Sequence, residues 1–230
     1  MNRIVANYFN LSVMRDALPD VLHGFGITLL VSVCVIVLGL VVGLCLGVLR
    51  LTPLRPIRFA IAVYTDVFRT LPQLVIIILL YFALPYANLT ISPFATTVLA
   101  LGGVLSAFAA DIFYAAILAV PQGQWDAAKA LGLKYPLILA KVILPQAVGL
   151  AIPLLTNRAI AIAKGTALGS AVSLPEMLST SQSITAIIAN PSPITLAAAF
   201  YLLLFIPLVI LSRRIERHAH GEQHRAGARR

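Results

Sequence analysis

Residues 124–145 read QWDAAKALGLKYPLILAKVILP, a polar and charged stretch in a chain that is otherwise strongly apolar. Asp126 begins an Asp-Ala-Ala triplet. Three residues separate this triplet from Gly132, and nine residues separate Gly132 from Val142-Ile-Leu-Pro145. Alanine, lysine and leucine favour a helix, and glycine commonly ends one. The stretch therefore predicts a short helix over residues 124–134 that lies at a membrane surface.

One face of this predicted helix is apolar. Trp125, Ala128 and Leu131 recur at three-residue spacing, while Asp126 and Lys129 remain polar. An apolar stripe on a short, sharply ended helix suits a groove in another protein. A plain interfacial helix between two membrane spans is the alternative interpretation of the amphipathic pattern taken alone.

The rest of the chain has the composition of a membrane protein. Hydrophobic residues make up 60% of its 230 residues, charged residues make up 11%, and the mean hydropathy is +0.96. This composition excludes an ordinary soluble domain. The net charge of +9 does not predict nucleic-acid binding, because most of the 17 Lys and Arg residues lie between apolar segments. They form three clusters: Arg50, Arg55 and Arg58; Lys129, Lys134 and Lys141; and Arg213, Arg214, Arg217, Arg225, Arg229 and Arg230.

The apolar segments predict an all-α, polytopic membrane protein with five transmembrane helices, because about 20 apolar residues cross a bilayer. The expected spans are residues 26–49, 59–84, 93–120, 146–164 and 194–211. Pro72 and Pro153 are candidate breaks in the second and fourth spans. If the basic clusters face the cytoplasm, the N-terminus is outside and the C-terminus inside. Residues 173–190 are then external, with a short helix that begins near Pro175.

These spans divide the chain into three expected regions: an external segment over residues 1–21, a membrane domain over 22–217 with the loop at 122–145, and a basic tail without regular structure over 218–230. Gly39, Gly43 and Gly47 lie on one face of the first span, where small residues let two helices approach closely. Ordinary packing within one subunit is the favoured interpretation of this glycine seam, and a seam that moves during transport is the alternative.

The loop at 122–145 resembles the EAA loop of ABC-importer membrane subunits, with Asp126 in place of the usual Glu and Val142 in place of the usual Ile. The resemblance extends over residues 23–217 to the polar amino-acid permeases, which include histidine, glutamine, arginine and opine importers. Further matching stretches are residues 64–72 (YTDVFRTLP), 117–133, 142–157 and 164–168. Two departures are Gly165 where relatives commonly have Asp, and Tyr114 where they often have Arg.

The resemblance implies a MetI-like ABC permease architecture in a bacterial inner membrane. It also implies four kinds of partner: a cytoplasmic ABC ATPase dimer, a second permease subunit, an external solute-binding protein and a small-molecule solute, in addition to membrane lipid. The implied ATPase-coupling residues are Trp125, Asp126, Ala127, Ala128, Leu131 and Gly132.

Charged and polar residues inside the spans are the candidate solute pathway, since such groups usually face a partner or a cavity. They are Arg69, Asp111, Asn157, Arg158 and Lys164. Counted along their helices, Arg69, Asp111 and Arg158 are expected in one layer. A structural ion pair among these three is the alternative to solute binding.

The chain itself is not expected to be an enzyme. It contains no G-x-x-x-x-G-K-[ST] phosphate loop, so ATP hydrolysis must come from a partner. No cofactor and no metal site are predicted. Two other function classes stay open: an ion-coupled carrier that uses Asp66 and Asp111 as proton sites, and a membrane scaffold. The absence of a convincing internal repeat speaks against the carrier.

Overall fold

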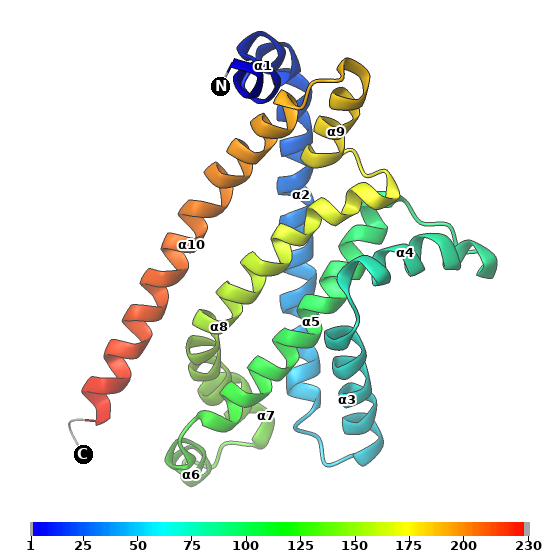
Figure 1. Cartoon of the computed structure of the whole chain (residues 1–230). Coiled ribbons are helices and arrows are strands. Elements are labelled where there is room, and N and C mark those ends of the chain that lie inside the picture. Colours follow the sequence, from blue (N-terminus) through cyan, green and yellow to red (C-terminus); the bar gives the residue numbers. More distant parts are fainter. Residues whose placement is uncertain (1, 228–230) are drawn as a thin grey trace.

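The computed structural model describes residues 2–227, with side chains from residue 4 to residue 217, and the described part is helical without strands (Figure 1). The α-helices are α1 (Asn2–Tyr8), α2 (Leu11–Leu49), α3 (Arg55–Thr70), α4 (Gln73–Ala83), α5 (Pro93–Ala119), α6 (Gln122–Ala130), α7 (Tyr135–Ile138), α8 (Leu144–Lys164), α9 (Met177–Ile188) and α10 (Ser192–Gly227). Four segments are long and apolar enough to cross a membrane, and a bent helix pair makes up to five. The predicted all-α class is confirmed.

The first span begins earlier than expected. Helix α2 starts at Leu11, because the side chain of Asn10 caps it by accepting from the N–H groups of Ser12 and Val13. Pro19 lies inside this helix without ending it. Part of the expected external segment is therefore continuous with the first span rather than separate from it.

The glycine seam of α2 packs against α5 in the same chain. A Cβ atom built on Gly39 would lie 2.6 Å from Leu105 Cβ, and one built on Gly43 would lie 2.4 Å from Ala109 Cβ. One built on Gly47 would approach the backbone oxygen of Ala110 to 3.0 Å. The missing side chains let the two helices meet at backbone distance. Packing within one subunit, the favoured interpretation, is what the structure shows.

The second span is broken. Helix α3 ends at Thr70, and α4 leaves it at an angle of 106°. Leu71 is extended, with φ −73° and ψ 137°, because the proline that follows it disfavours the helical region. The predicted break at Pro72 in the second span is confirmed.

The fourth span is longer than expected and is not broken at Pro153. α7, a π-helical turn (Leu139–Ile143), α8 and a 3₁₀ segment (Gly165–Val172) follow one another without interruption over Tyr135–Val172. Pro153 is buried inside α8, whereas Pro72 is exposed. A membrane helix can continue past a proline where neighbouring groups satisfy the backbone carbonyl that the proline frees, and the exposed Pro19 in α2 is a second case.

Glu176 and its neighbour Met177 join α9 and α10 to α2. Glu176 is fully buried and caps α9, where it accepts hydrogen bonds from Leu178 N–H at 2.9 Å and Ser179 N–H at 2.7 Å. The hydroxyl of Tyr201 on α10 donates to it at 2.8 Å, and the Met177 N–H donates to Thr28 Oγ1 on α2 at 3.2 Å. The short helix expected after Pro175 is confirmed, and it begins at Met177.

Replacing Glu176 by alanine should lower stability by about 3 kcal/mol, since it leaves buried donors on three residues without an acceptor. Thermal unfolding in detergent measures the loss. Gln182→Ala, an exposed substitution on the same helix, is the matched control. An equal melting temperature for the two variants would contradict the role of the cap.

The same carboxyl makes stability depend on pH. Burial raises the pKa of Glu176 above its ordinary 4.5, against the opposing hydrogen bonds from the Leu178 and Ser179 N–H groups. The folded protein then holds this proton more tightly than the unfolded chain, so stability falls as pH rises through the raised pKa. In thermal unfolding across a pH series, the advantage of the wild type over Glu176→Gln should shrink as pH increases from about 4.5.

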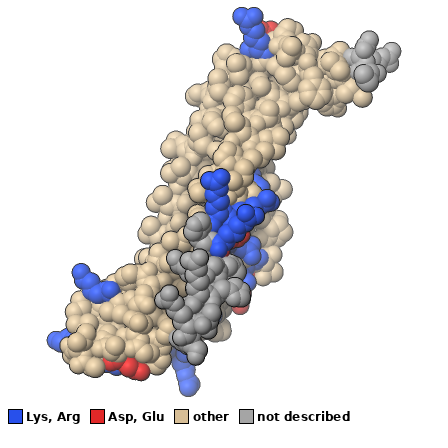
Figure 2. All heavy atoms as spheres, turned by 90° about the vertical axis from the view of Figure 1, so that its left-hand side faces the viewer, with Lys and Arg blue, Asp and Glu red and all other residues tan. Residues whose placement is uncertain are grey.

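Two of the three basic clusters lie at one end of the molecule. The turn between α2 and α3 and the α6–α7 region lie at the bottom of Figure 1, whereas Arg213 of the third cluster lines a cavity with Lys164 further along α8. The face in Figure 2 is mostly uncharged, with lysine and arginine side chains in a group partway along it and others near its ends. A surface that is mostly uncharged over its length fits a protein held across a membrane. Helix α10 extends to Gly227, past the expected start of the tail at residue 218, so the prediction of a tail without regular structure is wrong as far as that residue.

Candidate functional site

The stretch at 122–145 forms a short helix with a sharp glycine end. Helix α6 covers Gln122–Ala130, and Gly132 has a φ of +75°, a conformation that L side chains rarely adopt. The N–H of Leu133 donates to Ala128 O at 3.3 Å, and the N–H of Gly132 donates to Lys129 O at 2.8 Å. These two bonds form a Schellman motif, which satisfies the last carbonyl groups of the helix. The predicted helix end at Gly132 is confirmed, although α6 itself stops before the expected residue 134.

The apolar stripe of this helix is divided between two surfaces. Ala128 is 3% exposed and packs in the chain's own core, and Trp125 packs beside it with its ring stacked on Tyr135 at 6.0 Å. Leu131 is 80% exposed. Ala128 is therefore enclosed by its own chain and Trp125 is half-buried against it, and a groove-facing role for the apolar stripe stays a prediction that Leu131 fits best.

The outward surface of α6 is formed by other residues of the predicted set. Asp126 and Ala127 are exposed, and Asp126 lies 3.7 Å from Lys129. Beyond Leu131 there is a hollow of about 550 Å³ with mainly apolar walls. Its lining residues are Gly132, Leu133, Lys134, Pro136 and Leu137. An exposed leucine beside an apolar hollow, at the basic end of the molecule, can bind a protein partner.

Asp111 connects three helices through two arginines. Arg50, at the end of α2, donates to Asp111 Oδ1 at 2.5 Å, and Arg69 on α3 donates to the other carboxylate oxygen. Arg50 also lies over the ring of Tyr114, 4.7 Å from its centroid. Asp111 lies on α5, and each oxygen of its carboxylate therefore accepts a hydrogen bond from an arginine of the same chain.

Phe108 brings a third arginine to this cluster. The guanidinium carbon of Arg158 lies 4.2 Å from the centroid of the Phe108 ring, and that of Arg69 lies 5.3 Å from the same centroid. The expectation that Arg69, Asp111 and Arg158 share one layer is confirmed. Arg158 is exposed and, within the described part of the chain, has no carboxylate within 4.0 Å.

Replacing Asp111 by asparagine should cost about 1–2 kcal/mol of stability, since two charged hydrogen bonds are lost but both pairs are partly exposed. Asp126→Asn is the control, because its ion pair with Lys129 lies on the exposed loop. Thermal unfolding measures both variants. If Asp111→Asn has the same melting temperature as the wild type, the three helices are held together by apolar packing alone.

Asn157 belongs to a different contact. Its side-chain amide donates to Glu216, and its oxygen accepts from Ser212 Oγ at 2.7 Å. Both partners are on α10, so Asn157 joins α8 to α10 and is not part of the arginine cluster.

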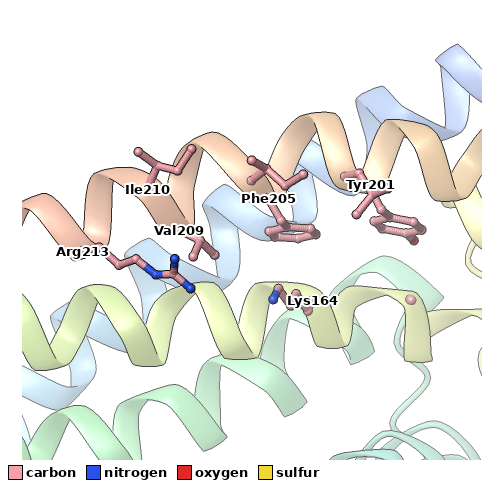
Figure 3. A pocket seen from close by; sticks show the side chains of 9 residues that line it. Lys164, Tyr201, Phe205, Val209, Ile210 and Arg213 are labelled. Atoms are coloured by element: carbon pink, nitrogen blue, oxygen red, sulfur yellow. The ribbon is translucent and has the colours of Figure 1, made fainter.

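Lys164 lies in a third place, where it lines a cavity of about 630 Å³ between the end of α8 and α10 (Figure 3). Its ammonium lies 5.6 Å from the centroid of the Phe205 ring, and Arg213 reaches from α10 toward α8 in the same view. Apolar residues of α10, including Leu202, Ile206 and Ile210, form most of the remaining wall. The five predicted pathway residues therefore occupy three places rather than one.

Three residues of these networks are not predicted as site residues by the sequence. Arg50 belongs only to a basic cluster there, and Phe108 and Glu216 carry no signal beyond ordinary composition. Phe108 lies three residues before Asp111, so the two share a helix face, which is the one pattern that suggests it. Glu216 has no comparable pattern, since its partner is 59 positions away.

Comparison with known proteins agrees with this architecture. Residues 35–221 match the family model described as binding-protein-dependent transport system inner membrane component. The chain is 34% identical over 170 residues to a probable amino-acid ABC transporter permease of Bacillus subtilis, with 74% of this chain and 75% of the relative covered. It is 32% identical over 213 residues to a probable glutamine ABC transporter permease of the same organism, with 90% and 99% covered.

Solved structures show the same fold. An amino acid ABC transporter with histidines superposes with a TM-score of 0.80 at 28% identity, covering 89% of this chain and 96% of the other. A methionine ABC transporter in an inward-facing conformation superposes with a TM-score of 0.64 at 21% identity, covering 91% and 97%, a likeness of fold alone. The chain therefore belongs to the family of inner-membrane components of binding-protein-dependent transport systems.

Proposed function

We propose that this chain is the membrane-spanning subunit of an ATP-driven ABC importer, and that its solute is an amino acid or a similar small polar molecule. The observation that carries the proposal is the exposed end of α6. A short helix with a glycine end stands next to a continuous helical segment that is long and apolar enough to cross the membrane. This arrangement suits the transfer of motion from a docked protein into the spans.

The proposed assembly contains four kinds of component. The sequence has no phosphate-binding loop, so a pair of cytoplasmic ATPases supplies the energy and docks at Leu131 and the adjoining hollow. A second permease subunit completes the solute pathway, and an external binding protein delivers the solute. The names of its relatives, which include glutamine, L-cystine and arginine permeases, support an amino-acid solute.

Arg158 and Lys164 are the proposed solute contacts. Asp111 and Arg69 bind one another, and Asn157 binds α10, whereas Arg158 and Lys164 are exposed and lie over aromatic rings. Cationic groups in these positions suit the carboxylate of an amino acid. Asp111 is thus assigned to holding the helices together rather than to binding the solute.

The proposed membrane domain covers residues 22–217, with the basic end in the cytoplasm and the N-terminus outside. The position of the α2–α3 turn and the α6–α7 region, which carry two of the basic clusters, at one end supports this orientation. An alkaline phosphatase fused after the last residue should stay inactive, because the enzyme needs the external compartment. An active fusion would reverse the assignment.

Uptake by the complete transporter in proteoliposomes tests the function. Uptake should require ATP on the cytoplasmic side and should survive collapse of the proton gradient. Lys164→Gln should raise the solute concentration that gives half-maximal uptake. Uptake by the chain alone, driven by an imposed gradient without ATP, would replace the importer with an ion-coupled carrier.

A further inference from the structure

Three arginines surround a cavity at the turn between α2 and α3. The cavity has a volume of about 360 Å³, and its walls are Arg50, Arg55, Arg58, Phe59 and Ala62. No acidic side chain lines it. The α3 helix begins at the same place, and Leu54, its N-terminal cap residue, provides no side-chain hydrogen bond.

The positive charge around this cavity is not neutralised within the described residues. Arg50 is bound to Asp111, but Asp111 also binds Arg69, so one carboxylate serves two arginines. Arg55 and Arg58 have no carboxylate within 4.0 Å in the described part of the chain. Like charges that converge on one hollow repel one another unless an anion lies between them. The positive end of the α3 dipole adds to this field.

The arginines are also well placed to bind an anion. The Asp111 carboxylate and the Tyr114 ring hold the Arg50 guanidinium in position, so little entropy is lost when it binds. Arg55 and Arg58 are three residues apart at the start of one helix, and both line the cavity. Guanidinium groups donate in pairs to the oxygens of a phosphate.

Apolar side chains stand at the rim of the cavity. Phe59 is 71% exposed, Leu54 is 55% exposed, and Val63, one turn further along α3, is 45% exposed. The nearest acidic residue on α3 is Asp66, about 10 Å along the axis from Phe59. A free phosphate ion would gain nothing from an apolar rim, whereas a lipid would place its acyl chains there. Basic pockets between helices at the cytoplasmic surface are suited to anionic headgroups.

We propose that this cavity binds the phosphate of an anionic phospholipid, such as phosphatidylglycerol, and that the lipid ties the α2–α3 turn to the membrane surface. The site is separate from Arg158 and Lys164, and it does not depend on the identity of the solute. It lies at the same end of the molecule as α6.

The test uses the purified transporter complex in detergent after extensive washing. Binding of phosphatidylglycerol and phosphatidylcholine is compared by thermal shift and by native mass spectrometry. Arg55→Gln/Arg58→Gln is the test variant. Arg213→Gln/Arg217→Gln is the matched control, because it removes the same charge outside the cavity. Phosphatidylglycerol should bind the test variant roughly 30-fold more weakly than the wild type, and the control within about twofold.

Three outcomes would overturn the proposal. Equal stabilisation of the wild type by both lipids would show that the headgroup charge is not recognised, whether or not the variants fold. Unchanged phosphatidylglycerol binding by Arg55→Gln/Arg58→Gln would place the lipid elsewhere. Full stabilisation by inorganic phosphate alone would make the ligand a free anion rather than a lipid. None of these outcomes bears on ATP-driven uptake.

Discussion

Gly43→Leu is expected to remove most of the folded protein from the membrane. A Cβ atom at this position would already lie 2.4 Å from Ala109 Cβ and 3.0 Å from Ser106 O, and the oxygen belongs to a backbone that cannot turn aside. Helices α2 and α5 form the most extensive contact of the fold, so they must separate to admit a leucine. Overpacking of this kind costs about 3 kcal/mol, and more where backbone blocks relaxation.

Size-exclusion chromatography of the detergent extract measures the effect as the loss of the monodisperse peak. Gly26→Leu is the matched control, because Gly26 lies on the same helix and no atom would lie within 4 Å of a Cβ at that position. The control should give a peak close to that of the wild type. A normal peak for Gly43→Leu would mean that α2 and α5 leave room for a leucine side chain between them, which would contradict the glycine seam.

Gly132→Trp is expected to uncouple ATP hydrolysis from uptake while the protein still inserts. The φ of +75° costs an L residue about 1–2 kcal/mol, so the Schellman end of α6 should change its shape. Apart from its two neighbours in the sequence, no described residue has an atom within 4 Å of a Cβ at this position, so the indole would project into the space where the ATPase is proposed to dock. Uptake in proteoliposomes should fall about tenfold or more relative to ATP hydrolysis.

Two further variants separate the effect of backbone conformation from the effect of side-chain size. Gly132→Asn should retain more coupling, since asparagine tolerates the left-handed region. Gly149→Trp introduces the same bulk on α8, at another position where no atom lies within 4 Å, and should leave the coupling ratio unchanged. Normal uptake by a well-inserted Gly132→Trp variant would exclude this end of α6 as the coupling surface.

Local patterns in the sequence predict most of the helices and the end of α6. They do not distinguish the two prolines, since Pro72 breaks a span and Pro153 does not. The residue type is the same in both cases, and exposure alone does not separate them, because Pro19 and Pro207 are exposed like Pro72 and yet lie inside unbroken helices. Whether a helix continues past a proline depends on its tertiary neighbours, which a single chain's periodicity does not contain.

The candidate site is predicted less completely, for a related reason. Counting residues along helices places Arg69, Asp111 and Arg158 in one layer. For these three residues, the position along the helix axis is enough to predict that they lie near one another. Such counting does not give the rotation of a helix about its axis. Asn157, adjacent to Arg158, therefore turns to α10, and Trp125 turns inward from the loop. Arg50 meets Asp111 because α2 and α5 pack closely, a contact between positions 61 residues apart.

The uninterrupted helical segment Tyr135–Val172 extends over 38 residues, from the loop beside α6 to the outer helix α9. Because the helical segments follow one another without a break, we expect them to move largely as one unit rather than independently. A small tilt imposed at Tyr135 becomes a much larger sideways displacement at Val172, tens of ångströms away. We therefore expect a motion imposed beside α6 to reach the far end of this segment. The two ends cannot change position independently unless the π-helical turn at Leu139–Ile143 yields first.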